Sequence, residues 1–140
     1  MKKIGFLLIV FIFKSCMTDL NAQDFYIMFG SGFSNDTVSL NIDRYTIFSN
    51  IVFTSDSVLG LSNDAELIFK DKHISVFKNG IVLSTMTFEY NRNLEIVISI
   101  NKKPYKFYLD LKKGKYLVIN KHQYYYNVNI NQYKKPILLE

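Results

Sequence analysis

Residues 73–101 read HISVFKNGIVLSTMTFEYNRNLEIVISIN, and this stretch decides the fold class. Asn79-Gly80 lies between two apolar runs that are rich in β-branched residues, and this dipeptide suits both left-handed positions of a type I′ hairpin turn. The residues 91–93 that follow are again typical of turns. The sequence therefore predicts three consecutive antiparallel strands in one sheet.

The third of these strands alternates between apolar and polar side chains. One side carries Leu94, Ile96, Ile98 and Ile100, and the other carries Glu95, Ser99 and Asn101. Alternation with a period of two indicates a strand with one buried face. A sheet with such a face needs a second layer to cover it.

The remainder of the chain favours the same class of structure. No segment has the sustained apolar spacing and end caps of a helix. About ten short strands are separated by turn residues at intervals of about ten positions. Residues 104–111 and 115–120 look like a second hairpin around Lys112-Lys113-Gly114. We predict an all-β protein, an antiparallel, jelly-roll-like β-sandwich, with a small up-and-down or OB-like barrel as the alternative.

The first 22 residues have the pattern of a signal peptide. Lys2 and Lys3 precede the apolar run Ile4–Phe13, and Ala22 offers a small residue at a plausible cleavage point. This run is too short to cross a bilayer, which takes about 20 residues. We expect residues 1–22 to be removed, residues 23–140 to form one β-sandwich domain, and the product to be periplasmic, secreted or on the cell surface.

Cys16 is the single cysteine of the chain and follows the apolar run. A cysteine at this place can be the lipidated residue of a bacterial lipoprotein, although Lys14 is not the small apolar residue that such sites carry. Contact with a membrane is expected only if Cys16 is lipidated. The domain after Ala22 has no cysteine, which excludes a disulfide, a thiol nucleophile and a cysteine metal site.

The net charge of +5 falls to +3 once residues 1–22 are removed. Nine lysines and a single acid, Asp110, lie between Lys102 and Lys135. A basic segment can indicate nucleic acid, an anionic surface or an acidic partner. Export argues against nucleic acid, so we interpret these lysines as charges that keep strands soluble and block pairing at sheet edges.

The sequence gives no sign of a catalytic centre. His73 and His122 are far apart in the chain, and no nucleophile, zinc or phosphate-loop motif is present. The acids that could form a glycosidase pair alternate with apolar residues, as solvent-facing side chains do. We therefore expect a protein that is not an enzyme and that needs no cofactor.

A calcium site is the one metal hypothesis that the sequence supports. If strands alternate in direction, the loops at residues 31–36 and 55–64 emerge at the same end, which would gather Asp36, Asp56 and Asp64. Ca²⁺ prefers oxygen ligands of this kind. The alternative is that these carboxylates bond to nearby backbone N–H groups and so form turns.

A face of tyrosine and amide side chains is the other candidate site. On the last strand Tyr125, Asn127 and Asn129 share one side, and Tyr108 could extend it from a neighbouring strand. Aromatic rings beside fixed amides are suited to binding sugars, and the alternative is a solvated sheet face. The resulting hypothesis is an exported, non-catalytic module that binds a polysaccharide. The alternative is an envelope accessory or structural subunit that contacts an envelope protein through a sheet edge or the apolar tail at residues 137–139.

Overall fold

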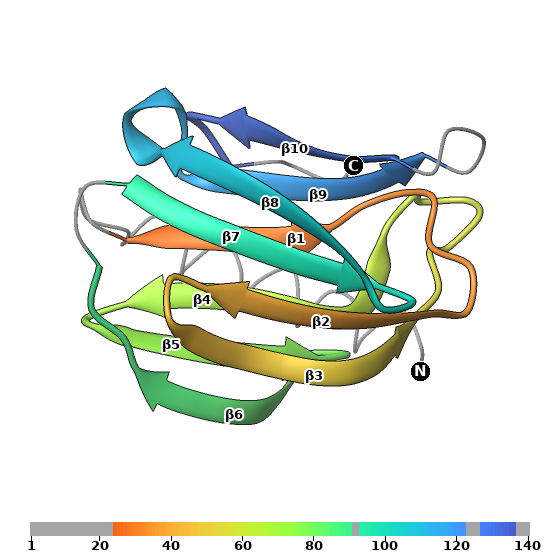
Figure 1. Ribbon diagram of the computed structural model, residues 1–140, viewed down its shortest axis with the longest axis horizontal. Helices are drawn as coiled ribbons and strands as arrows, with labels where there is room; N and C mark the ends of the chain where they lie inside the picture. Colours follow the sequence, from red (N-terminus) through yellow and green to blue (C-terminus); the bar gives the residue numbers. More distant parts are fainter. Residues whose placement is uncertain (1–23, 91–92, 123–126, 137–140) are drawn as a thin grey trace.

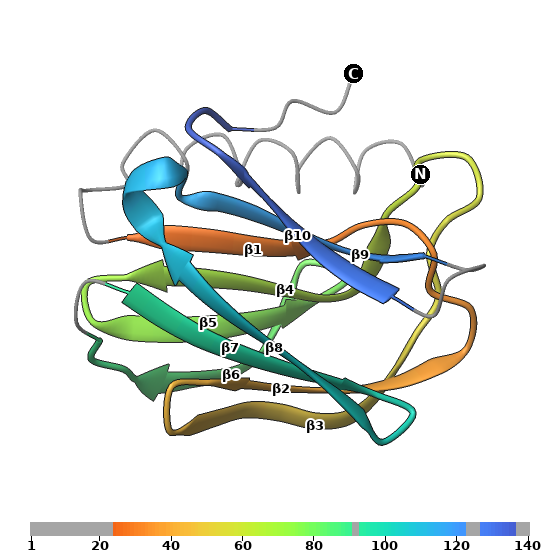
Figure 2. The ribbon, with the colours of Figure 1, turned by 45° about the horizontal axis from the view of Figure 1, so that its top comes forward.

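The computed structural model describes residues 24–90, 93–122 and 127–136, and these residues form two stacked β-sheets (Figures 1 and 2). The larger sheet has the strand order β10 (Asn127–Tyr133), β9 (Tyr116–His122), β1 (Phe25–Phe29), β4 (Ser62–Lys70), β5 (His73–Lys78), β6 (Ile81–Thr87). The smaller sheet has the order β3 (Tyr45–Phe53), β2 (Asp36–Ile42), β7 (Asn93–Ile100), β8 (Lys103–Asp110). The predicted all-β sandwich is confirmed, and the strands form two separate sheets rather than one closed sheet.

The predicted hairpin at Asn79-Gly80 is confirmed. β5 and β6 pair in antiparallel fashion, and the two turn residues have φ angles of 49° and 78°. The third strand, however, does not join them. β7 pairs with β2 and β8 in the smaller sheet, so the prediction of a three-stranded sheet across residues 73–101 is wrong. The physical reason is that the apolar face of β7 can be buried in the core from either of the two sheets, and alternation alone does not show which sheet the strand joins.

The second predicted hairpin is also wrong. A short 3₁₀ helix, Leu111–Lys113, carries the chain from β8 in the smaller sheet to β9 in the larger sheet. β9 then pairs in parallel with β1, which is the one parallel pair among the described strands. The Gln132 side chain holds this connection by donating to the carbonyl oxygens of Asp110, at 2.9 Å, and Gly114, at 3.2 Å. The described residues contain no helix that is long and apolar enough to cross a membrane.

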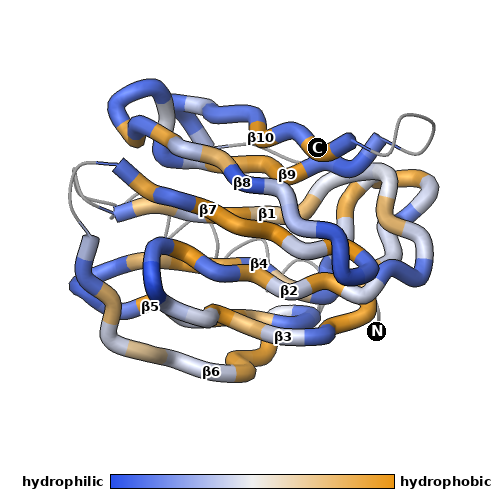
Figure 3. Tube along the Cα trace, in the orientation of Figure 1, coloured by the Kyte–Doolittle hydropathy of each residue, from blue (hydrophilic) through white to orange (hydrophobic). Residues whose placement is uncertain are grey.

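The main core lies between the two sheets. Phe25, Ile27 and Phe29 of the central strand β1 face the predicted apolar side of β7 and are fully buried. Figure 3 shows the same arrangement as apolar stretches along the inner strands, with polar residues gathered at the turns. Each fully buried side chain of this size contributes about 1.5–3 kcal/mol from removal of its apolar surface from water, so this layer supplies most of the stability.

The outer face of the larger sheet carries a second, smaller apolar cluster. It consists of Tyr26, Met28, Ile68, Tyr116 and Val118, all of which are buried. Within it the Tyr26 hydroxyl donates a hydrogen bond of 2.7 Å to the carboxylate of Glu66. Burial raises the pKa of both groups, and the charge of Glu66 raises the pKa of Tyr26 further. Tyr26 therefore stays protonated at neutral pH and acts as the donor.

Candidate functional site

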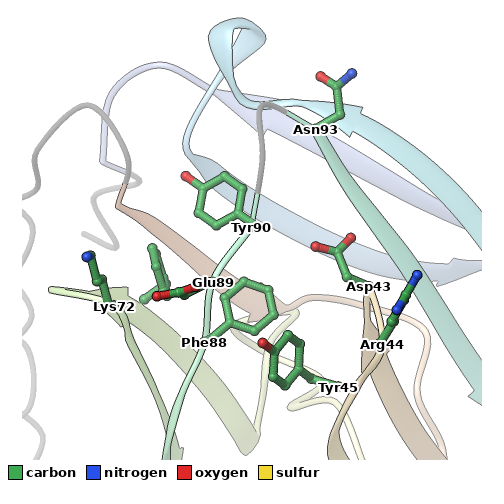
Figure 4. Close-up of a pocket in the computed structure, with 9 residues that line it drawn as sticks. Asp43, Arg44, Tyr45, Lys72, Phe88, Glu89, Tyr90 and Asn93 are labelled. Carbon is green, nitrogen blue, oxygen red and sulfur yellow. The ribbon is translucent and has the colours of Figure 1, made fainter.

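A shallow depression of about 710 Å³ lies at one end of the sandwich. Three connections that are far apart in the sequence form it: the β2–β3 turn, the β4–β5 turn and the segment that follows β6. Figure 4 shows the side chains that line it. They are Asp43, Arg44, Tyr45, Phe69, Lys72, Phe88, Glu89, Tyr90 and Asn93.

Hydrogen bonds fix the β2–β3 turn to β7, and the β4–β5 turn to the segment that follows β6. The N–H of Asp43 donates to the carbonyl of Glu95 on β7 at 2.7 Å, and the N–H of Glu95 donates back to Oδ1 of Asp43 at 2.9 Å. The N–H of Phe88 donates to the carbonyl of Lys72 at 2.8 Å. Because each connection is bonded to another part of the scaffold, the walls of the depression are largely pre-formed.

Aromatic rings form the floor of the depression. The ring centroids of Tyr45 and Phe88 lie 4.7 Å apart, and those of Phe69 and Phe88 lie 5.4 Å apart in an edge-to-face arrangement. Tyr90 packs against Phe69 at 5.3 Å. Phe69 and Phe88 are buried, whereas Tyr45 keeps 36% of its surface exposed. Tyr45 is therefore the ring that a ligand can reach most easily.

Tyr90 is half-buried beside these rings. Burial, together with the negative charge of Asp24, raises the pKa of its hydroxyl to about 12. A phenol with this pKa remains protonated throughout the physiological range, so Tyr90 can donate a hydrogen bond but cannot act as a base.

Charged and amide groups surround the aromatic floor. Asp43 and Arg44 lie on one side of the rings and Lys72 on the other, with Glu89 beside the rings (Figure 4). The exposed amide of Asn93 completes the rim. The lining residues include no serine, cysteine or histidine. An open, ring-floored surface with donors and acceptors of both charges is suited to binding a polar ligand that has an apolar face.

The structure does not place Tyr108 on a strand next to the other residues of the predicted tyrosine and amide face. Asn127 and Asn129 lie on one side of β10, at the edge of the larger sheet. Tyr108 is 71% exposed on β8, which pairs with β7 in the other sheet, so β8 is not the neighbour of β10 that the prediction required. Oδ1 of Asn129 is buried and has no hydrogen-bond partner among the described residues. Tyr125 lies outside the described residues.

The loops of the calcium hypothesis do meet, as predicted. The N–H of Ser55 donates to the carbonyl of Phe33 at 2.9 Å, and the N–H of Phe33 donates to Oγ of Ser55 at 3.0 Å. Their carboxylates, however, do not gather. The described parts of the chain hold no group of three or more His, Cys, Asp or Glu side chains that could bind a metal ion.

Each of the three carboxylates has its own hydrogen-bond donors instead. Asp56 accepts from the N–H groups of Val58 and Leu59 at 2.7 and 3.0 Å, and these bonds lower its pKa. Asp64 accepts from the N–H of Thr54 and from the Ser62 hydroxyl, both at 2.8 Å. Asp36 is buried in an ion pair with Lys121. These contacts match the turn-forming alternative.

Sequence reasoning missed the depression because its residues come from separate turns. The available signal was weak: Arg44-Tyr45 and Glu89-Tyr90 each place a charge beside a ring near a strand end. Isolated pairs of this kind are common in turns and carry no spacing that points to a site. Neither a protein-family model, nor a curated protein, nor a solved structure matches this chain, so the geometry alone carries the functional interpretation.

Proposed function

We propose that this chain is an exported, non-catalytic module that binds a polysaccharide at the aromatic depression. The observation that carries the proposal is the exposed ring of Tyr45, which packs on the buried ring of Phe88 with Tyr90 beside it and is surrounded by charged and amide groups. Sugar rings have one apolar face that stacks on an aromatic ring, and they have hydroxyl groups that hydrogen-bond to carboxylates, amides and guanidinium groups.

The shape of the depression supports a polymer rather than a small, enclosed ligand. It is open to solvent, and the exposed groups Arg44, Lys72 and Asn93 lie at its rim. A long chain can pass through an open depression and needs no movement of the walls. Because the walls are hydrogen-bonded to the scaffold, little ordering accompanies binding, which favours affinity.

The test is a titration of the protein with a panel of soluble cell-wall and plant polysaccharides, followed by calorimetry or affinity electrophoresis. Tyr45→Ala removes the most exposed ring of the floor. We expect this variant to weaken binding at least about tenfold, which corresponds to about 1.4 kcal/mol. Far-UV circular dichroism will show whether the variant keeps its β-structure.

Tyr108→Ala is the matched control because it removes an exposed tyrosine from β8, at the opposite edge of the smaller sheet from β3, which carries Tyr45. Binding that is unchanged in Tyr108→Ala and weakened in Tyr45→Ala supports the depression as the site. If Tyr108→Ala weakens binding and Tyr45→Ala does not, the depression is not the site. If no polysaccharide in the panel binds, the proposed function fails.

Export is part of the proposal and rests on the sequence of residues 1–22, which lie outside the described residues, as does Cys16. N-terminal sequencing of the protein recovered from the envelope and from the culture medium tests it. A mature chain that begins at about residue 23 supports a signal peptidase substrate. A lipid-modified chain that begins at Cys16 supports the lipoprotein alternative.

The alternative function, an envelope accessory or structural subunit that contacts an envelope protein, has one observation in its favour. Three consecutive apolar residues, Ile81, Val82 and Leu83, are exposed on an edge strand. Exposed apolar groups in a row are typical of contact surfaces. The second proposed contact, the tail at residues 137–139, lies outside the described residues. A chain that binds no polysaccharide but co-purifies with an envelope protein would favour this alternative.

A further inference from the structure

β6 is an edge strand with an unusual composition. It pairs with β5 on one side, and no described strand pairs with its other side. Ile81, Val82 and Leu83 are 70%, 54% and 51% exposed, and Ile81–Thr87 contains no charged residue and no proline. The free N–H and C=O groups of an apolar edge strand are a template for pairing with another strand.

The other three edge strands carry features that block such pairing. β8 begins with Lys103 and Pro104 and exposes Lys106. β3 has two shifts of register against β2, and Asn50 within it has a φ of 56°. β10 is a row of amides that runs into the exposed residues Lys134 and Lys135. Charges, proline and bulges are the devices that proteins use to protect edges. β6 has one bulge of its own, at Leu83, but among the described edge strands it alone exposes three consecutive apolar residues.

We infer that β6 pairs in antiparallel fashion with β6 of a second copy of this chain. Two copies related by a two-fold axis present the same strand to each other, and an uncharged strand can face itself without repulsion. Lys78 and Glu89 are exposed; Lys78 is the last residue of β5 and pairs with Ile81 at the start of β6, and Glu89 lies two residues beyond the end of β6. Antiparallel pairing brings Lys78 of one copy towards Glu89 of the other, whereas parallel pairing would place like charges together.

The β5–β6 register limits how extensive this contact is. A bulge at Leu83 leaves Ser84–Thr87 as the regular part of β6. Pairing therefore uses a short run of backbone hydrogen bonds, and burial of the Ile81–Leu83 side chains adds an apolar term. Interfaces of this size are at the small, transient end of the range. We expect a dimer that forms with rising protein concentration. The edge strand and the aromatic floor are different surfaces, so the inference does not rest on the proposed function, although Glu89 lies both at the end of β6 and in the lining of the depression.

Sedimentation velocity over a range from micromolar to millimolar concentration tests the inference on the full chain. Val82→Lys places a charge in the apolar run, and we expect it to weaken self-association at least about tenfold, as does Ile81→Lys. Asn131→Lys, on the opposite edge strand β10, is the matched control and should associate like the wild type. A wild type that stays monomeric, or association that all three substitutions affect equally, would overturn the inference.

A charge exchange tests the antiparallel orientation separately. Glu89→Lys and Lys78→Glu each place like charges at the two ends of the paired strands, so each should weaken association. The double variant Lys78→Glu/Glu89→Lys restores opposite charges and should recover most of the wild-type association. If the double variant remains as weak as the single variants, the strands do not pair in this orientation. High salt should reduce the differences among the variants, because these ends are exposed to solvent.

Discussion

The ion pair between Asp36 of β2 and Lys121 of β9 joins the two sheets, and its removal gives the sharpest test of the packing. Nζ of Lys121 lies 2.8 Å from both carboxylate oxygens, and Asn101 and the N–H of Ser34 also donate to Asp36. Lys121→Met keeps the length of the side chain and leaves a buried carboxylate without its cation. Removing one partner of a buried pair costs about 3–5 kcal/mol. The Lys121 side chain is 18% exposed, which places the expected loss of unfolding free energy near the lower end of that range.

The pH dependence of this loss follows from the protonation of Asp36. Burial alone would raise its pKa, but the hydrogen bonds from Lys121, Ser34 and Asn101 outweigh burial and hold the pKa below its usual value. In the wild type the unfolded chain thus binds this proton more readily than the folded chain. The pair's stabilisation is complete above the ordinary aspartate pKa of about 3.9 and is lost as the pH falls through the lower, folded value. Lys121→Met removes the hydrogen bond and the charge of Lys121, both of which lower the pKa of Asp36, so its pKa rises and protonation at acid pH relieves the buried charge.

Urea unfolding followed by far-UV circular dichroism measures both effects, and the absence of tryptophan makes fluorescence a weaker probe. The stability difference between wild type and Lys121→Met should be about 3 kcal/mol at neutral pH and should shrink at acid pH. The double variant Asp36→Asn/Lys121→Met should be more stable than Lys121→Met at neutral pH, because it has no buried charge. A difference below about 1 kcal/mol, or one that does not change with pH, would refute a buried ion pair between the sheets.

Two further predictions concern a turn and the candidate site. Gly32 and Gly60 have positive φ angles of 92° and 66°. A Cβ added at Gly32 would overlap the backbone carbonyl of Lys121, whereas a Cβ added at Gly60 would meet no atom within 4 Å. Gly60→Ala should cost about 1 kcal/mol and Gly32→Ala about 1–3 kcal/mol more in urea unfolding, and equal losses would contradict the described contact. Tyr90→Phe should remove one step near pH 12 from the tyrosinate absorbance titration. Because the folded state keeps this proton to a higher pH than the unfolded state does, the contribution of Tyr90 makes the stability of the wild type fall as the pH rises from 10 to about 12. Identical titration curves in the two proteins would exclude a buried Tyr90 hydroxyl.

The sequence predicts local features of this fold better than it predicts strand partners. Alternation identifies the buried face of β7, and Asn79-Gly80 identifies a turn, because both depend on neighbouring residues only. The hairpin that the prediction missed joins β7 to β8 through Asn101 and Lys102, with φ angles of 51° and 71°. A left-handed lysine is unfavourable, so propensity points away from a tight turn there. Lys112-Lys113-Gly114 looks like a better turn, yet it crosses between the sheets.

The transfer of β7 to the smaller sheet explains both surfaces that the sequence did not reveal. Since β7 does not continue the larger sheet, no described strand covers the outer side of β6, and its apolar edge is exposed. The residues after β6 must instead pass around the end of the sandwich, where the β2–β3 turn is already bonded to β7 through Asp43 and Glu95. That path places Phe88 against Tyr45 and so builds the aromatic floor. If β7 paired with β6, as residues 73–101 suggest, neither the exposed edge nor the depression would exist.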